Sequence, residues 1–210
     1  MKLYYSPGAC SIGIRLILEE TGAPFTCEKL DLAGRQQLGA DFVAINAKSK
    51  VPTLVRDDGS VLTEFPAIAL WLGLSFPERQ MVPADAEGMA RSIEMIDYIV
   101  ATMHMQGFTR IFRPANFSPD PNSHEEVKAR GREIFQKGLQ IVDASLSRLP
   151  TSPRGFTIAD GALFYISFWA SARLQQPLPE RLAKHYTALK ARPSARKVLT
   201  EEGFEAELSK

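Results

Sequence analysis

Strand patterns in this chain of 210 residues end near residue 63, and helical patterns fill the remainder. Residues 2–5 are rich in β-formers, and residues 10–22 carry apolar side chains at helical spacing before Gly22. Residues 25–32 then alternate as a second strand. Strand, helix and strand in this order predict a βαβ unit, with a parallel strand pair and a right-handed connection.

The residues that follow predict a helix, a hairpin and another helix. The first helix covers residues 36–45, and Asp58-Gly59 between two apolar runs is a strong hairpin signal for residues 51–62. The second helix runs from Pro66 to about residue 76, since proline suits a first helical turn. Residues 1–78 therefore have the predicted order βαβ-α-ββα.

Beyond this region the pattern is all-helical. A polar stretch near prolines is assigned as a linker over residues 79–86, and the helical region covers residues 87–210. The segment Thr157–Asp160 has the shape of a capping box at the start of one helix. Helical periodicity occurs in residues 89–111, 125–149, 158–174, 179–191 and 195–201.

Charge and composition exclude several classes of partner. The chain has 25 basic and 24 acidic residues, so no net field favours nucleic acid or an anionic membrane. No apolar run approaches the roughly 20 residues of a membrane helix. Two cysteines and three scattered histidines suggest neither a disulfide framework nor a metal site. We therefore expect a cytoplasmic protein without a metal.

Cys10 is placed where the first predicted strand gives way to the first helix. A thiol at a helix N-terminus lies among unpaired N–H groups at the positive end of the helix dipole, which favours the thiolate. Alternatively, Cys10 is a small apolar filler, as free cysteine often is. Position alone leaves both open. Cys27 alternates inward on the second strand and is expected to be inert core.

Five motifs resemble those of the cytosolic glutathione transferases. The segment Y-S-P-G-A-C-S at 5–11 is similar to the opening of the bacterial beta class, and N-A-K-S-K-V-P-T-L at 46–54 to the family's N-P-x-x-x-V-P-x-L. The segments T-E-F-P-A-I at 63–68, F-T-I-A-D at 156–160 and R-P at 192–193 match further family motifs. Ala47 and Phe65 depart from the usual proline and from Ser or Gly.

The resemblance implies a fold and an activity. The fold is an α/β thioredoxin-like domain with a mixed four-stranded sheet, followed by an all-α bundle. The implied activity is conjugation of glutathione, the co-substrate, to small hydrophobic electrophiles in a homodimer. Two alternatives stay open, namely thiol-disulfide exchange through a Cys10 mixed disulfide and a non-catalytic binding or regulatory role.

The resemblance also implies how glutathione binds. The tripeptide adds a strand beside a cis Val51-Pro52 bond, where the Val51 N–H and C=O pair with its cysteinyl unit. Glu64 and the Phe65 N–H face the γ-glutamyl end. Arg35, with Lys50 nearby, is placed to bind the glycyl carboxylate; alternatively, either is a solvated surface charge. The predicted glutathione-binding residues are Tyr5, Cys10, Arg35, Lys50, Val51, Pro52, Glu64 and Phe65.

Cys10, Ser11 and His104 are the catalytic residues that the resemblance implies. The Ser11 hydroxyl and the Cys10 N–H are the expected donors to the glutathione thiolate, whereas Tyr5 is expected to pack. Alignment from one side places His104 on the family's second-domain histidine, and alignment from the other side places Met105 there, so one residue is inserted. A π-bulge can absorb such an insertion; otherwise His104 points about 100° away.

Other side chains are assigned by helix face alone. The segment 164–169 is aromatic at helical spacing and is expected to be core. Asp160 is expected to be a buried cap, and His124 and His185 surface or packing residues. The predicted residues of the hydrophobic acceptor pocket are Met103, Phe108, Ile111 and Phe112.

Overall fold

The computed structural model describes residues 1–209, and its first part is built on a four-stranded sheet. Strands β1 (Lys2–Tyr5), β2 (Thr26–Lys29), β3 (Thr53–Val55) and β4 (Val61–Thr63) lie in the order β2-β1-β3-β4. The pair β1-β2 is parallel, and the pairs β1-β3 and β3-β4 are antiparallel. The mixed sheet and the parallel βαβ unit are confirmed.

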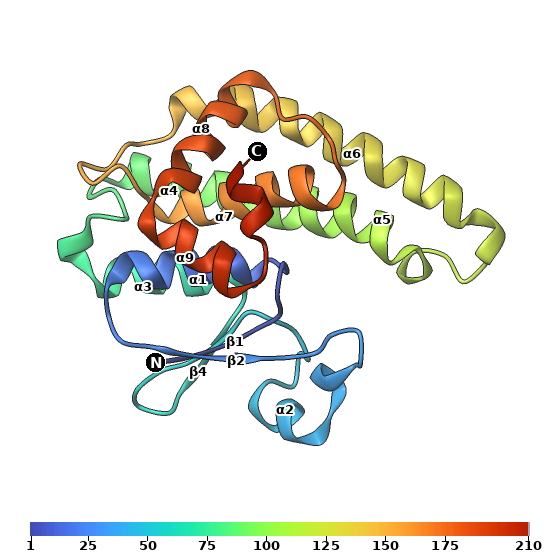
Figure 1. Cartoon of the computed structure of the whole chain (residues 1–210), viewed down its shortest axis with the longest axis horizontal. Helices are drawn as coiled ribbons and strands as arrows, with labels where there is room; N and C mark the ends of the chain where they lie inside the picture. The colour runs from blue at the N-terminus through green and yellow to red at the C-terminus, as the bar shows by residue number, and fades with distance from the viewer. Residues whose placement is uncertain (210) are drawn as a thin grey trace.

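Helices cover both faces of this sheet (Figure 1). Leu3 and Leu54, which are partners across β1 and β3, are fully buried in the core that includes α1 (Ser11–Thr21) and α3 (Phe65–Ser75). On the other face, Tyr4 packs its ring 5.5 Å from that of Phe42 in α2 (Ala40–Ile45). The period-two alternation of β1 therefore buries both faces.

The helix predicted over residues 36–45 is interrupted. A 3₁₀ turn, Gln36–Leu38, comes first, and α2 follows after Gly39. Gly39 has an extended backbone, with φ −69° and ψ 148°, so no helical hydrogen bond runs across it. The predicted hairpin and the start of α3, with Pro66 in its first turn, are confirmed.

The second part contains only helices among the described residues (Figure 1). Residues 80–85 hold no helix or strand, and the boundaries predicted for the linker stay a prediction. Within residues 1–209 no helix combines the length and apolarity that crossing a membrane would require. The main helices are α4 (Ala86–Asp97), η3 (Tyr98–Phe108), α5 (Thr109–Phe112), α6 (His124–Ser145), α7 (Ile158–Phe168), η7 (Trp169–Arg173), α8 (Glu180–Ala191) and α9 (Pro193–Glu201). Short 3₁₀ turns are Pro77–Arg79, Pro114–Asn116, Pro121–Ser123, Leu146–Arg148 and Glu205–Ser209.

The segment Tyr98–Phe108 is a π-helix, continuous with α4 before it and α5 after it. The Thr109 N–H and hydroxyl both bind the His104 carbonyl, five residues back, the hydroxyl at 3.0 Å. Of the two alternatives that the sequence left open, the structure shows the π-helical one, which can absorb an extra residue.

The two parts meet at α1 and α7. A Cβ atom on Gly13 would overlap the Gly161 carbonyl, so the two backbones touch and neither glycine tolerates a side chain. The predicted capping box is confirmed, because Asp160 accepts the Thr157 N–H at 2.6 Å. Asp160 also lies 2.7 Å from His185 Nε2, which gives His185 a packing role.

Candidate functional site

The turn between β1 and α1 is clamped by residues from the far end of the chain. Gly8 has φ +68°, a conformation that favours glycine. Its N–H donates to Glu202 Oε2 at 2.8 Å, and its carbonyl accepts the Trp169 indole N–H at 2.9 Å. Arg173 reaches the Pro7 carbonyl at 3.4 Å. Three side chains of the helical part therefore fix the backbone that leads to Cys10.

Cys10 is buried at this turn, with 7% of its surface exposed. Its thiol donates to the Val51 carbonyl at 3.6 Å. Burial raises the pKa of Cys10 to about 12, although the N–H groups of Cys10 and Ser11 act in the opposite direction. Of the two alternatives left open for Cys10, burial favours the apolar neutral thiol over the thiolate, because desolvation outweighs the amide dipoles. Cys10 is a neutral thiol.

The Ser11 hydroxyl does not face the sulfur site. It is fully buried, donates to the Ser6 carbonyl at 3.3 Å and accepts the Ser6 N–H at 3.2 Å. The role of hydroxyl donor expected for Ser11 is thus corrected to one of closing the turn. Tyr5 packs as expected, because it is buried with the Arg15 guanidinium 5.2 Å from its ring centre.

The Val51-Pro52 bond is cis, as the resemblance implied. The Val51 carbonyl faces the Cys10 thiol, so the prediction that this carbonyl points outward is corrected. A residue without an assigned role organises the loop. Buried Asn46 donates to the Lys50 carbonyl at 3.0 Å and to Thr53 Oγ1 at 2.8 Å. Asn46 opens the motif at residues 46–54, so the motif could have drawn attention to it, but a sequence motif does not show its hydrogen-bond partners.

Glu64 begins α3 with φ +71°, outside the regions that side chains commonly adopt. Its side chain is 57% exposed and pairs with Lys48 Nζ at 2.8 Å. Phe65 is buried, with its ring 5.2 Å from that of Tyr165. The side chains of Arg35 and Lys50 are exposed, without an ion pair in residues 1–209. Both remain predicted ligands of a carboxylate.

His104 lies between the rings of Tyr165, at 6.0 Å, and Trp169, at 4.7 Å. Burial, together with the positive charges of Lys50 and Arg113, lowers the pKa of His104 to about 4. Lys50 belongs to the sheet part, so the ring lies where the two parts meet. Met105 is 37% exposed. The π-helix thus turns His104 inward as a neutral imidazole.

The predicted acceptor residues divide into two pairs. Phe108 stacks on Trp169 at 3.8 Å and on Phe112 at 4.3 Å, and Phe112 is 50% exposed. Met103 is fully buried against Gly138, and Ile111 packs on Gly131. Full burial of Met103 argues against its assignment to the pocket, whereas Ile111 is partly buried and stays a predicted pocket residue. These two side chains fill the space that the glycines leave on α6.

Two site residues were expected to be core only. Trp169 and Tyr165 are buried, but Trp169 also holds Gly8 and stacks on Phe108. The Tyr165 hydroxyl has no hydrogen-bond partner in residues 1–209, and burial raises its pKa well above the usual value, with Cys10 adding to the shift. Helical spacing alone does not distinguish a ring that lines a site from one that fills a core.

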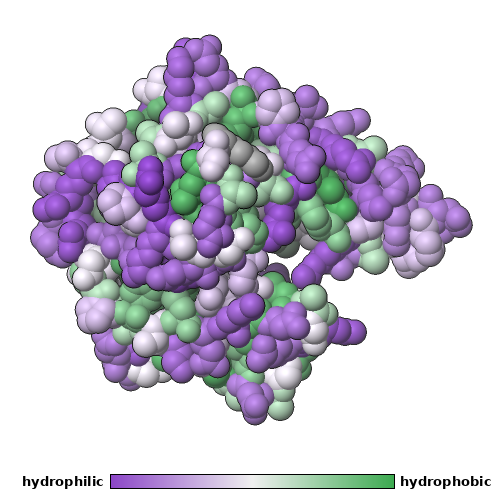
Figure 2. Space-filling model, in the orientation of Figure 1, coloured by the Kyte–Doolittle hydropathy of each residue, from purple (hydrophilic) through white to green (hydrophobic). Residues whose placement is uncertain are grey.

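The space between the two parts is open at one side. Figure 2 shows a notch on the right, between the helices above and the segment around α2 below. Cys10, the loop at Val51 and His104 lie where the parts meet, and Phe112 is exposed. In the described part of the chain, no three metal-binding side chains come together. The arrangement can hold a sulfur compound near Cys10, beside the stacked rings of Trp169 and Phe108.

Comparison with known proteins agrees with this geometry. Residues 8–74 match the model of the glutathione S-transferase N-terminal domain. Glutathione S-transferase GstA of Escherichia coli O157:H7 is 36% identical over 208 residues, covering 97% of this chain and 100% of the relative. A beta-class glutathione S-transferase of Sphingomonas chungbukensis superposes with a TM-score of 0.80 at 31% identity, over 97% of this chain and 100% of the other.

A third protein was solved with its ligand. The glutathione transferase homologue from Sulfitobacter with bound glutathione has a TM-score of 0.84 at 25% identity, over 97% of this chain and 98% of the other. The sequence match covers nearly the whole chain, and the four-stranded sheet and the helical part superpose on the solved structures. This chain belongs to the glutathione S-transferase family.

Proposed function

We propose that this protein conjugates glutathione to small hydrophobic electrophiles, with the glutathione sulfur bound as a thiolate at the start of α1. The neutral Cys10 thiol at this helix end carries the proposal. A neutral thiol can donate a hydrogen bond, and the N–H groups of Cys10 and Ser11 stabilise negative charge at the same place. A thiolate from outside can use all three donors once the Cys10 S–H turns from the Val51 carbonyl to the incoming sulfur.

The proposed step balances without a further reactant. The glutathione thiol releases its proton to solvent, and its sulfur attacks the electrophilic carbon. A C–S bond forms, and the leaving group departs with the electrons of its former bond. A free thiol has a pKa of about 8.5, and lowering it by about two units takes roughly 2.7 kcal/mol. Charge-assisted hydrogen bonds of the kind proposed are strong enough for this.

The remaining predicted contacts orient the peptide. The exposed Glu64 carboxylate, which pairs with Lys48 in the free protein, meets the γ-glutamyl ammonium with its remaining acceptor positions. The Phe65 N–H, at the start of α3, receives the α-carboxylate. Arg35 or Lys50 binds the glycyl carboxylate. His104 has a pKa of about 4, so near neutral pH it contributes a neutral ring for packing and hydrogen bonding rather than a positive charge.

Thiol-disulfide exchange would require Cys10 itself to attack as a thiolate. Burial that raises the pKa of Cys10 to about 12 disfavours that form. This observation favours conjugation over exchange for this chain.

Two measurements test the proposal together. The first is turnover of chlorodinitrobenzene with glutathione by the wild-type protein and by Cys10→Ala and Cys10→Ser. Wild type should be active, and Cys10→Ala should lose about tenfold in kcat/KM, since one donor of three is removed. The second is the intact mass after incubation with oxidised glutathione, which should show no adduct on Cys10. Absence of turnover would overturn conjugation, and a stoichiometric Cys10 adduct would favour exchange.

A homodimer and a cytoplasmic location belong to the same proposal. Leu74 on α3 and Val61 on β4 are exposed apolar side chains on neighbouring elements, which supports a partner surface there. Both cysteines are free, which fits a reducing compartment. Light scattering should give a particle of twice 23.3 kDa. A mass of one chain at micromolar concentration would contradict the dimer.

A further inference from the structure

The aromatic stack of the site ends in an exposed ring followed by an exposed cation. From buried Trp169 the stack runs through Phe108 to Phe112, with interplanar angles of 16° and 25°. Phe112 is the last residue of α5, and half of it is exposed. Arg113 comes next. Its side chain is exposed and makes no hydrogen bond or ion pair within residues 1–209.

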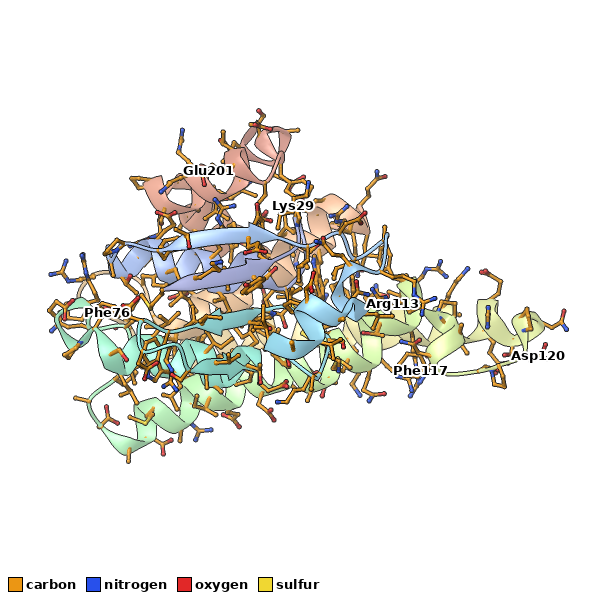
Figure 3. The ribbon with its side chains drawn as sticks, turned by 90° about the horizontal axis from the view of Figure 1, so that it is seen from below. Lys29, Phe76, Arg113, Phe117, Asp120 and Glu201 are labelled. Carbon is orange, nitrogen blue, oxygen red and sulfur yellow. The ribbon has the colours of Figure 1, made fainter. Side chains whose placement is uncertain are left out.

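The position of Arg113 differs from that of the other arginines on these helices. Arg110 donates to the Gln106 carbonyl at 2.7 Å and lies over the Phe117 ring at 4.0 Å. Arg91 pairs with two glutamates of its own helix. Figure 3 shows Arg113 at the end of α5, next to the segment around α2 in that view, and Figure 2 shows the notch between these parts. Arg113 is thus an exposed, uncompensated charge directly after the exposed end of the aromatic stack.

A second exposed cation without an ion pair in residues 1–209 is Lys50, in the sheet part. The charges of Lys50 and Arg113 both act on His104, one from each part of the molecule. The nearby Glu64 carboxylate is already occupied by Lys48. In the proposed function, the glycyl carboxylate of glutathione occupies Lys50 or Arg35. Arg113 is then left for the other substrate.

We propose, resting on the transferase function above, that the acceptor is a planar aromatic electrophile that carries a carboxylate or similar anionic group. Its ring packs against Phe112 and the edge of Phe108, and its anionic group pairs with Arg113. The thiolate attacks the ring carbon that bears the leaving group, so that C–S forms and a halide leaves with its bonding electrons. The anionic group takes no part in the chemistry. Arg113 is a specificity-determining residue.

A matched substrate pair tests this inference. A chloronitrobenzoate and the methyl ester of the same acid share one ring, one leaving group and one reacting carbon, and they differ in charge. Arg113→Gln should lower kcat/KM for the acid about tenfold, equal to about 1.4 kcal/mol, and change that for the ester by less than about twofold. Arg113→Lys should restore part of the loss. Arg110→Gln removes an equal charge three residues away and should change neither value.

The outcomes separate the two proposals. If wild type uses the ester but Arg113→Gln leaves the acid unaffected, or lowers both substrates equally, the anionic acceptor is wrong while conjugation stands. The same holds if Arg110→Gln has the same effect as Arg113→Gln, since the charge would then act without a specific contact. If wild type turns over chlorodinitrobenzene but neither of these two substrates, the anionic acceptor is wrong while conjugation stands. If it turns over none of the three, conjugation itself fails and the inference fails with it.

Discussion

Replacing Gly8 with alanine tests whether the clamped turn before α1 is the support of the site. Gly8 has φ +68°, and a side chain in this region costs about 1–2 kcal/mol. A Cβ atom there would also overlap Arg173 Nη2 and lie 2.8 Å from Phe204 Cζ. Arg173 is flexible and can move, but it then loses its contact with the Pro7 carbonyl. We expect a total loss of about 2–3 kcal/mol.

Gly203 provides the matched control, because it has φ +82° and no atom lies within 4 Å of its Cβ position. Gly203→Ala should cost only the backbone part, about 1–2 kcal/mol. Urea denaturation followed by tryptophan fluorescence gives the free energy of unfolding of both variants, and kcat/KM with chlorodinitrobenzene gives the effect on the site. Gly8→Ala should lose activity, and Gly203→Ala should keep it. Equal stability losses and equal activities would refute the reasoning.

Four further predictions address single side chains. Tyr165→Phe removes a buried hydroxyl without a partner, so the unfolding free energy should rise by about 1 kcal/mol or stay unchanged; a large loss in thermal denaturation would show a hidden partner. Because His104 has its pKa lowered to about 4, the unfolded chain binds its proton first as pH falls. Stability should therefore fall from about pH 6.5 to 4 by up to about 3 kcal/mol, and His104→Gln should remove this part of the pH dependence. Met103→Ala should lower the unfolding free energy by about 3 kcal/mol without a specific rise in the KM for the electrophile, because Met103 packs on α6. Phe112→Ala should do the reverse, raising that KM several-fold with less than about 1 kcal/mol of lost stability.

Local patterns predicted the framework of the site. The β-rich strand at 2–5, the Asp58-Gly59 turn and the capping box each depend on neighbouring residues, and each was predicted correctly. Near His104 the sequence limited the outcome to two alternatives, since an extra residue in a helix has few solutions, and the structure shows the π-helix. These features are fixed within one element.

Contacts between distant elements decided what the sequence left open. Cys10 is neutral because residues from both parts bury it, and a dipole argument on one helix does not include that burial. Met103 turns away from the site because Gly138, 35 positions later, leaves room on α6. The hydrogen bond from the Trp169 indole to the Gly8 carbonyl joins residues that are 161 positions apart. Periodicity identifies a buried side chain but not the element that buries it.

Titration of the glutathione sulfur in the complex tests the central claim most directly. The ultraviolet absorbance of the thiolate is followed against pH in wild type and in Cys10→Ala, each saturated with glutathione. We predict a bound thiol that ionises about two units below the ordinary value of about 8.5, with a smaller shift in Cys10→Ala and no ionisation of Cys10 itself below about pH 9. A bound thiol that titrates at its ordinary value, or a thiolate that forms on Cys10 near neutral pH, would contradict the account.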